Sequence, residues 1–330
     1  MWPEPGPDWD VAYSLWGPAW PVHVYFFAVM YGLVALLAVC VLSTFFKKFQ
    51  LCVRSKMTIS VVIMILIFGL SRAVFLCLDP YLASGEISPI LYHLLWSIGP
   101  PVQTSAFSIV LLVELLDSTK LEIGPPRFQK LSTIATITLC HFAIVLTIHM
   151  LVLYHPDVSD LLIVCQTVFI VYGAALAVGY FYVGVAIKRN CTITHAGDHQ
   201  GHQIQRLIRI SFLSAAIAGS ISVTYLYASV SEFGVHSDIA FVDPWAWWTL
   251  QSFMRLEEVV VCFLVLITVC KSSSYDTFVG KLSGCCKGND LESQDEDRLN
   301  DGQSTSTSGI KMKAFSFVPF IKRQSLTTQI

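Results

Sequence analysis

The sequence predicts an all-α fold, a polytopic bundle of seven transmembrane helices with its N-terminus outside the cell or in a lumen and its C-terminus in the cytosol. Composition is the first reason: 54% of the residues are hydrophobic, 13% are charged and the mean hydropathy is +0.62. An average soluble domain carries about 25% charged residues. Seven long apolar stretches and a one-sided distribution of lysine and arginine are the second and third reasons.

Each apolar stretch is long enough to cross a bilayer. A hydrocarbon core of about 30 Å requires roughly 20 apolar residues in a helix that rises about 1.5 Å per residue. In chain order, the expected helices cover residues 22–46, 57–78, 90–116, 131–154, 161–187, 208–230 and 245–270. The chain is therefore expected to comprise an N-terminal segment (1–21), a membrane domain (22–270), a juxtamembrane amphipathic turn (271–287) and a disordered cytosolic tail (288–330).

The orientation follows from the connections between helices, because short loops rich in lysine and arginine stay in the cytosol. Basic residues occupy the first, third and fifth connections: Lys47, Lys48, Arg54, Lys56, Lys120, Arg127, Lys130, Lys188, Arg189, Arg206 and Arg209. The N-terminal segment and the even-numbered connections hold none and carry acidic residues instead. The N-terminal segment also lacks the basic stretch of a removable signal peptide, so we expect the first helix to act as an uncleaved signal anchor.

The cysteines suggest no disulfide framework, because the expected outward connections contain none. Cys77 and Cys165 lie near the outward ends of the second and fifth helices, where a pair between them is the alternative to the free, buried thiols that we expect. A glycosylation sequon starts at Asn190, beside Lys188 on an expected cytosolic connection. It should therefore carry no glycan.

Ionisable residues inside the predicted helices mark the main candidate site, since each costs about 2.5 to 3.5 kcal/mol to insert unless it is paired. The second helix carries Arg72, and the seventh carries Arg255, Glu257 and Glu258. Arg255 and Glu258 share a face at a spacing of three, which Gln251 extends by one turn. A buried polar network joining the two helices is expected, either as a switch, ion path or ligand counter-ion, or as a lock on helix packing.

This spacing also predicts the effect of two substitutions. If Arg255 is the partner of Glu258, Arg255→Leu strands a buried carboxylate and lowers the yield of folded protein. Glu258→Gln is then expected to be the milder change.

The third helix contains Gly99, Pro100 and Pro101, and the prolines remove hydrogen bonds from the helix ladder. Gln103 follows, and His141 on the fourth helix is expected to face the same interior. We therefore expect a kink next to a small cavity. Its polar side chains are either part of a substrate site or hydrogen bonds between helices that shape the bundle.

In the fifth connection His195, His199 and His202 recur at spacings of four and three, which would place three imidazoles on one side of a helix. A zinc site and a solvated polar linker are the two interpretations. Gly197 and Gly201, with no cysteine pair nearby, favour the linker. We predict no metal and no cofactor.

Two features follow the seventh helix. Cys285 and Cys286 come after a short amphipathic turn and are candidates for S-palmitoylation, with unmodified thiols as the alternative. Thr328, Gln329 and Ile330 supply the hydroxyl and the terminal aliphatic side chain that PDZ domains bind by strand addition and carboxylate capture.

Several runs of sequence carry a family resemblance: WGPAWPVHVY from Trp16, SRAVFLCLDPY from Ser71, LLWSIGPPVQTSAF from Leu94 and PWAWWTLQSFMRLEE from Pro244. Together they resemble the membrane domain of the proline-rich transmembrane protein 3/4 family, over about residues 16–270. The resemblance implies a polytopic membrane protein whose molecular activity is poorly defined. The sequence holds no long proline-rich region of the kind expected in that family, so no role of such a region is carried over.

The leading interpretation is a receptor-like or scaffold-organising membrane protein that recruits cytosolic PDZ-domain proteins. An orphan receptor of the G-protein-coupled type is one alternative, although the third helix ends in ELLDSTK, from Glu114 to Lys120, and lacks an acidic–arginine–aromatic triplet. A small-solute or ion transporter is another, although no internal repeat is evident.

No catalytic motif stands out, so an enzyme is not expected. Membrane lipid is an expected partner and nucleic acid is not, and the residues name no ligand. The plasma membrane is the expected location, with an endomembrane as the alternative.

Overall fold

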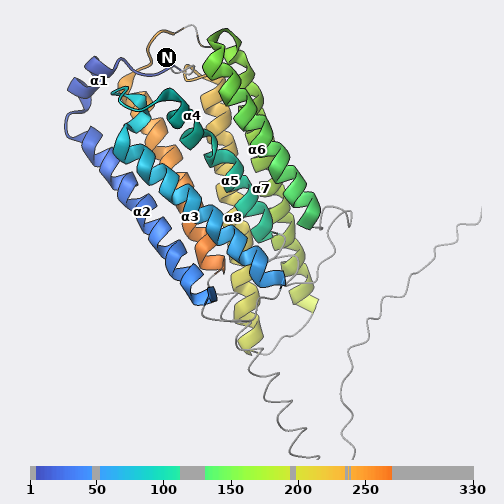
Figure 1. Cartoon of the computed structure of the whole chain (residues 1–330). Coiled ribbons are helices and arrows are strands. Elements are labelled where there is room, and N and C mark those ends of the chain that lie inside the picture. Colours follow the sequence, from blue (N-terminus) through green and yellow to red (C-terminus); the bar gives the residue numbers. More distant parts are fainter. Residues whose placement is uncertain are drawn as a thin grey trace, which may run out of the picture. The chain divides into compact units, whose positions relative to one another are not determined.

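The computed structural model of the chain describes residues 5–46, 53–111, 131–193, 198–234, 237 and 239–269. Within these ranges the backbone is helical or irregular and contains no β-strand. The chain divides into two compact units, residues 1–276 and 277–330, and every described residue belongs to the first. Figure 1 shows this unit as a bundle of long helices that run side by side.

A short helix that the sequence analysis missed precedes the first membrane helix. α1 (Trp9–Trp16) begins after Asp8, whose carboxylate accepts a hydrogen bond from the backbone N–H of Asp10 at 3.2 Å. It ends at Gly17, which adopts a φ of +46° and donates its N–H to the carbonyl of Tyr13 at 3.1 Å. An acidic N-cap and a glycine in the left-handed region are the usual limits of a helix.

α2 (Ala19–Phe46) and α3 (Val53–Leu78) pack against each other over much of their length (Figure 1). Gly69 lies at the contact, where an added Cβ would come within 3.0 Å of the carbonyl oxygen of Tyr31 and 3.2 Å of the backbone nitrogen of Ala35. Glycine at this position therefore sets the spacing of the two helices, as small residues do in membrane bundles.

The connection from α3 to the next helix is held by a buried carboxylate. Asp79 accepts hydrogen bonds from the backbone N–H groups of Ser84 at 3.0 Å and Glu86 at 2.9 Å. The 3₁₀ turn η1 (Pro80–Leu82) lies between Asp79 and Ser84, and Tyr81 in this turn has a φ of +61°. This left-handed conformation is unfavourable for tyrosine, so the loop that Asp79 organises has to stabilise it.

The third expected helix has a break in its hydrogen-bond ladder, in agreement with its glycine and two prolines, although Ile98 at this break keeps helical dihedral angles (φ −66°, ψ −30°). α4 (Pro89–Ser97) and α5 (Gly99–Val110) meet at Ile98. Pro100 and Pro101 have no N–H to donate to the preceding turn. The description of this span ends at residue 111, so the end expected at residue 116 lies beyond it.

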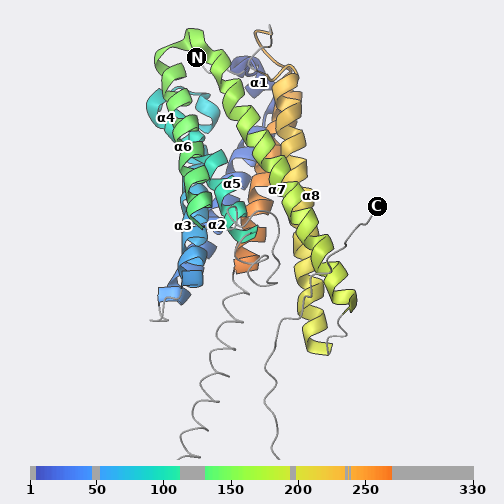
Figure 2. The ribbon, with the colours of Figure 1, turned by 90° about the vertical axis from the view of Figure 1, so that its right-hand side faces the viewer.

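The remaining elements are α6 (Leu131–Tyr154), η3 (Pro156–Leu161), α7 (Leu162–Ile193), α8 (Asp198–Val230) and a helix over residues 244–269. α7 and α8 pack closely along each other (Figure 2). Gly173 permits the approach, because an added Cβ would lie 2.5 Å from Oγ of Ser222. Both helices run beyond their apolar windows into the basic connection, so Asn190 belongs to α7 rather than to a loop.

Five helices in the described part of the chain are long and apolar enough to cross a membrane. They cover Ala19–Phe45, Met57–Leu78, Ala135–Tyr154, Pro156–Arg189 and Gln205–Val230. The other two expected spans are not among these five helices, for two physical reasons. The third is broken at Ile98, and the helix over 244–269 carries the charges of Arg255, Glu257 and Glu258. The chain is thus a multi-pass arrangement of helices, and the count of seven stays a prediction.

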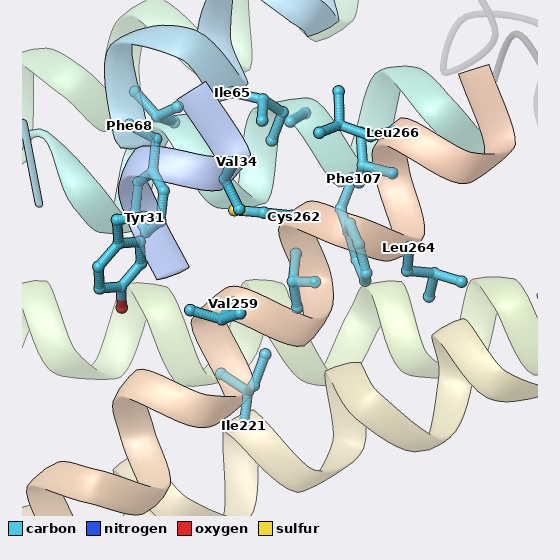
Figure 3. Close-up of a cluster of buried hydrophobic side chains, with 14 of the residues drawn as sticks. Tyr31, Val34, Ile65, Phe68, Phe107, Ile221, Val259, Cys262, Leu264 and Leu266 are labelled. Carbon is cyan, nitrogen blue, oxygen red and sulfur yellow. The ribbon is translucent and has the colours of Figure 1, made fainter. Parts of the chain in front are cut away.

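The helix over 244–269 lies in the centre of the core. Figure 3 shows its residues Val259, Cys262, Leu264 and Leu266 packed among side chains from α2, α3, α5 and α8: Tyr31, Val34, Ile65, Phe68, Phe107 and Ile221. Trp245 and Thr249 face outward near the start of this helix, and a narrow apolar stripe of Phe253, Leu256, Val260 and Ile267 follows them. A helix with charges and so little outer surface is shielded from lipid by its neighbours.

The outer surface of the bundle is apolar. On α2, Val22, Tyr25 and Val29 are 61–67% exposed. Such a surface is suited to lipid rather than to water. Cys77 and Cys165 are free thiols, as expected, although Cys77 is exposed where a buried thiol was predicted.

Candidate functional site

Three charged residues predicted to lie inside the membrane meet in the core. Glu258 accepts hydrogen bonds from Nη2 of Arg72 at 3.2 Å and from Nη1 of Arg255 at 2.6 Å. The hydroxyl of Tyr31 on α2 donates to the same carboxylate at 2.5 Å. The three charged side chains are 1–3% exposed. We refer to Tyr31, Arg72, Arg255 and Glu258 as the Glu258 cluster.

Glu257 is separate from this cluster. Its Oε1 accepts hydrogen bonds from the hydroxyls of Ser220 at 2.5 Å and Thr224 at 3.2 Å, both on α8. Consecutive residues of a helix point about 100° apart, so Glu257 and Glu258 face different neighbours. The structure thus divides the predicted network of four charges, and the Glu258 cluster holds two guanidinium groups against one carboxylate.

Trp96, the penultimate residue of α4, packs on both guanidinium groups. Its ring centroid lies 5.0 Å from Cζ of Arg72 and 4.9 Å from Cζ of Arg255, within the range of cation–π attraction. Gly99 adjoins Arg72 from the other side of the break, where an added Cβ would overlap Nη2 and lie 2.9 Å from Cζ. The break in the third span therefore lies directly against the cluster.

The other predicted polar residues are divided between two places. Gln251 joins the cluster, because its Oε1 accepts a hydrogen bond from Nη2 of Arg255 at 3.4 Å. Nδ1 of His141 instead lies 3.2 Å from the hydroxyl of Thr104, linking α6 to α5. Gln103 is 5% exposed, and its Nε2 has no hydrogen-bond partner among the residues that the structure describes.

A pocket of about 610 Å³ adjoins the cluster. Arg72, Trp96 and Gln251 form the part of its wall next to the ion pairs. The rest of the wall is mainly apolar and rich in aromatic side chains, among them Trp9, Tyr92, Phe169, Phe233, Phe241 and Trp247. We refer to it as the aromatic pocket. Among its described lining residues, Arg72 is the one that carries a formal charge.

The N-terminal segment supplies part of the pocket wall and is fastened in place. The carbonyl of Gly6 accepts a hydrogen bond from the N–H of Val242 at 3.1 Å. Nε1 of Trp16 donates to the carbonyl of Pro244 at 3.2 Å. α1 and the residues before it are therefore attached to the start of the helix over 244–269 and to the connection that precedes it.

Tyr81 completes this end of the pocket. Its hydroxyl is hydrogen-bonded to Nε2 of His23 at 2.9 Å, and Nδ1 of His23 is 2.8 Å from the hydroxyl of Ser252. The ring of Tyr81 lies edge-on to Trp247, with 4.9 Å between centroids. Burial raises the pKa of the Tyr81 hydroxyl to about 12, so it stays protonated at neutral pH.

Sequence reasoning missed Tyr31, Trp96 and the pocket wall formed by Trp9. Tyr31 had a detectable signal, because a tyrosine in the middle of an apolar helix needs a partner for its hydroxyl. Trp96 lies one turn before a glycine–proline–proline break, which also marks it as a candidate. Trp9 had no such signal, because its place depends on α1.

Several predicted sites cannot be placed. His195, Cys285, Cys286 and the terminal residues Thr328, Gln329 and Ile330 lie outside the described residues, and the side chains of His199 and His202 are likewise not described. Within the described part of the chain, no group of three or more histidine, cysteine or acidic residues is arranged to hold a metal ion.

The apolar exterior, the membrane-length helices and the buried charges together define a multi-pass integral membrane protein. A family model described as the proline-rich transmembrane protein 3 domain matches residues 1–285. The chain belongs to this family, in agreement with the resemblance read from the sequence. A comparison with curated proteins gives no match.

Proposed function

We propose that this chain is a receptor-like membrane protein of seven helices that binds a small molecule in the aromatic pocket. The pocket carries the proposal. Its volume of about 610 Å³ lies within the roughly 300–1,000 Å³ of typical small-molecule sites. A mainly apolar lining rich in aromatic side chains, with a small number of polar groups that include Arg72 and Gln251, is also typical of such sites.

In this proposal the ligand enters from outside the cell or from a lumen. The pocket wall includes Gly6 of the N-terminal segment and Phe241 of the connection over residues 231–243. Both segments lack lysine and arginine, whereas basic connections are retained in the cytosol.

The Glu258 cluster provides a physical link between the pocket and the helices. Trp96 lines the pocket and packs on both guanidinium groups, which join α3 to the helix over 244–269 through Glu258. A ligand that displaces Trp96 changes the surroundings of both ion pairs. A ligand can shift the equilibrium between two arrangements of the helices only if it binds one of them more tightly than the other.

A substitution that fills the pocket tests this proposal directly. Ala228 lines the pocket, whereas Leu226 on the same helix is 49% exposed to the outside. The full chain, purified in detergent, would be screened for small molecules that raise its unfolding temperature. Hits are expected to act on the parent and on Leu226→Trp but not on Ala228→Trp. Hits that act equally on all three, or a screen without hits, would remove the pocket as a binding site.

The scaffold role belongs to the same proposal and rests on the tail. Thr328, Gln329 and Ile330 would recruit cytosolic PDZ-domain proteins, with palmitoylated Cys285 and Cys286 holding the tail near the membrane. Proximity labelling in intact cells, with and without Ile330, tests this role. A labelled set of PDZ-domain proteins should vanish on truncation, and an unchanged set would contradict it.

A transporter is the second candidate, favoured by the helix break at Ile98, because broken helices line substrate sites in transporters. Uptake of a pocket ligand into proteoliposomes would favour this candidate, and binding without uptake would favour the receptor. An orphan receptor of the G-protein-coupled type is a further alternative that no described residue favours.

A further inference from the structure

We propose that the aromatic pocket takes a small organic anion, a carboxylate or a similar group attached to an aromatic or apolar body, and that Arg72 binds the anionic group. The inference rests on the proposed ligand-binding function and names the chemical class of the ligand. It depends on three observations: the free donors of Arg72, the charge of the Glu258 cluster and the composition of the pocket wall.

Arg72 has hydrogen-bond donors that no described residue uses. The residue is 1% exposed and lines the pocket. Nη2 donates to Glu258 at 3.2 Å, but Nε and Nη1 are buried and have no hydrogen-bond partner in the part of the chain that the structure describes. These two nitrogens carry three N–H groups. Buried donors of a charged group are costly to leave unpaired, and a ligand with acceptor oxygens would satisfy them.

The charge of the surroundings selects an anion. Arg72 and Arg255 share the single carboxylate of Glu258, so this cluster has one uncompensated positive charge. Glu257 forms no ion pair with either arginine among the described residues, and its Oε1 accepts hydrogen bonds from the hydroxyls of Ser220 and Thr224 instead. Away from water, an uncompensated charge attracts a counter-ion strongly.

The rest of the described wall offers no carboxylate to pair with a cation and suits an apolar body. The described lining residues include no aspartate or glutamate, so an ammonium group would meet Arg72 without a carboxylate beside it. Trp9, Phe169 and Trp247 offer ring faces and edges instead. Aromatic rings pack well on such a wall in stacked or edge-on contacts.

A purely structural role for Arg72 is the competing explanation. The ring of Trp96 lies 5.0 Å from the guanidinium and that of Phe68 lies 5.3 Å from it, so cation–π contacts already compensate part of the charge. An aromatic ring attracts the charge but offers no oxygen to accept a hydrogen bond, and Nε and Nη1 have no such acceptor among the described residues. The cation–π contacts therefore do not satisfy Nε and Nη1.

The test uses the full chain in detergent and a matched series of probes. The probes are naphthyl-alkanoates of three chain lengths, each with its primary amide and its primary amine. Binding is followed by quenching of tryptophan fluorescence, and Ala228→Trp and Leu226→Trp report whether a probe occupies the pocket. For at least one length, the acid is expected to bind about 10-fold or more tightly than the amide. The amine should bind least.

The acid-to-amide ratio in the parent chain decides the inference without any change to Arg72. In Arg72→Gln, which keeps the Arg255–Glu258 pair, the ratio should fall to about one. Amides or amines that enter the pocket as tightly as the acids would overturn the anionic ligand while leaving the binding pocket intact. Failure of every probe to bind would overturn both proposals. Competition by sodium chloride with no preference for the acid would mark a site for a small inorganic anion and overturn the organic ligand.

Discussion

At the scale of single residues, Glu258 is the group on which the buried charges depend. Its carboxylate accepts hydrogen bonds from Arg72, Arg255 and Tyr31. Two guanidinium groups from two helices thus share one counter-charge. When one member of a buried ion pair is removed, the charge that remains is the main source of the cost.

This arrangement reverses the order of two substitutions. Spacing along the helix predicts that Arg255→Leu strands Glu258, but Arg72 still pairs with Glu258 in that variant. Glu258→Gln leaves two buried guanidinium groups without a carboxylate. We expect Glu258→Gln to lose about 3–5 kcal/mol of stability and Arg255→Leu to lose less. Thermal unfolding and folded yield in detergent measure both effects.

Glu257→Gln is the matched control, because it alters the neighbouring carboxylate in the same helix. The amide oxygen of glutamine can still accept hydrogen bonds from Ser220 and Thr224, so little stability should be lost. If Arg255→Leu loses the most stability of the three variants, Glu258 is not the shared counter-charge of both arginines.

At the scale of elements, the break between α4 and α5 is fitted to the cluster. Gly99 follows Ile98 and leaves room for the guanidinium of Arg72, which an added Cβ would overlap. Pro100 and Pro101 fix the break, since neither can donate a backbone hydrogen bond. Gly99 therefore allows Arg72 to approach the backbone closely, and the two prolines interrupt the hydrogen bonds of the helix at this point.

Gly99→Ala is expected to push Arg72 away from Glu258 and to cost about 1–3 kcal/mol of stability through overpacking. Gly32→Ala on α2 is the control, because nothing lies within 4 Å of its added Cβ. The unfolding temperatures of the two purified variants give the comparison. Equal temperatures would mean that Arg72 adjusts without loss and that the break is not fitted to it.

The sequence predicted the elements better than their contacts. Apolar windows found the cores of α2, α3, α6, α7 and α8, because lipid selects for length and hydropathy. The same windows missed α1, whose limits depend on local capping at Asp8 and Gly17. The sequence also named Arg72, Arg255 and Glu258, but it did not separate Glu257. That separation depends on how the helix is rotated in the bundle, which packing decides.

At the scale of the whole molecule, the polar ends of the bundle differ in charge. The end that holds Gly6, Tyr81 and Val242 joins the N-terminal segment to two connections without lysine or arginine. The basic residues Lys188 and Arg206 lie on α7 and α8, on either side of residues 194–197. If the rule of cytosolic basic loops holds, the pocket faces away from the cytosol.

Glycan mapping in cells tests this orientation. Asn190, at the cytosolic end of α7 in this scheme, should stay unmodified although it begins a sequon. Glu86→Asn creates a second sequon with Ile87 and Ser88 in the connection after α3. The fold should accept this change, because Glu86 binds Asp79 through its backbone N–H. We expect Glu86→Asn to add mass that a glycosidase removes, and Asn190→Gln to leave the mass of the parent unchanged. A glycan at Asn190 would place that end of α7 outside the cytosol, reverse the bundle and turn the aromatic pocket toward cytosolic ligands.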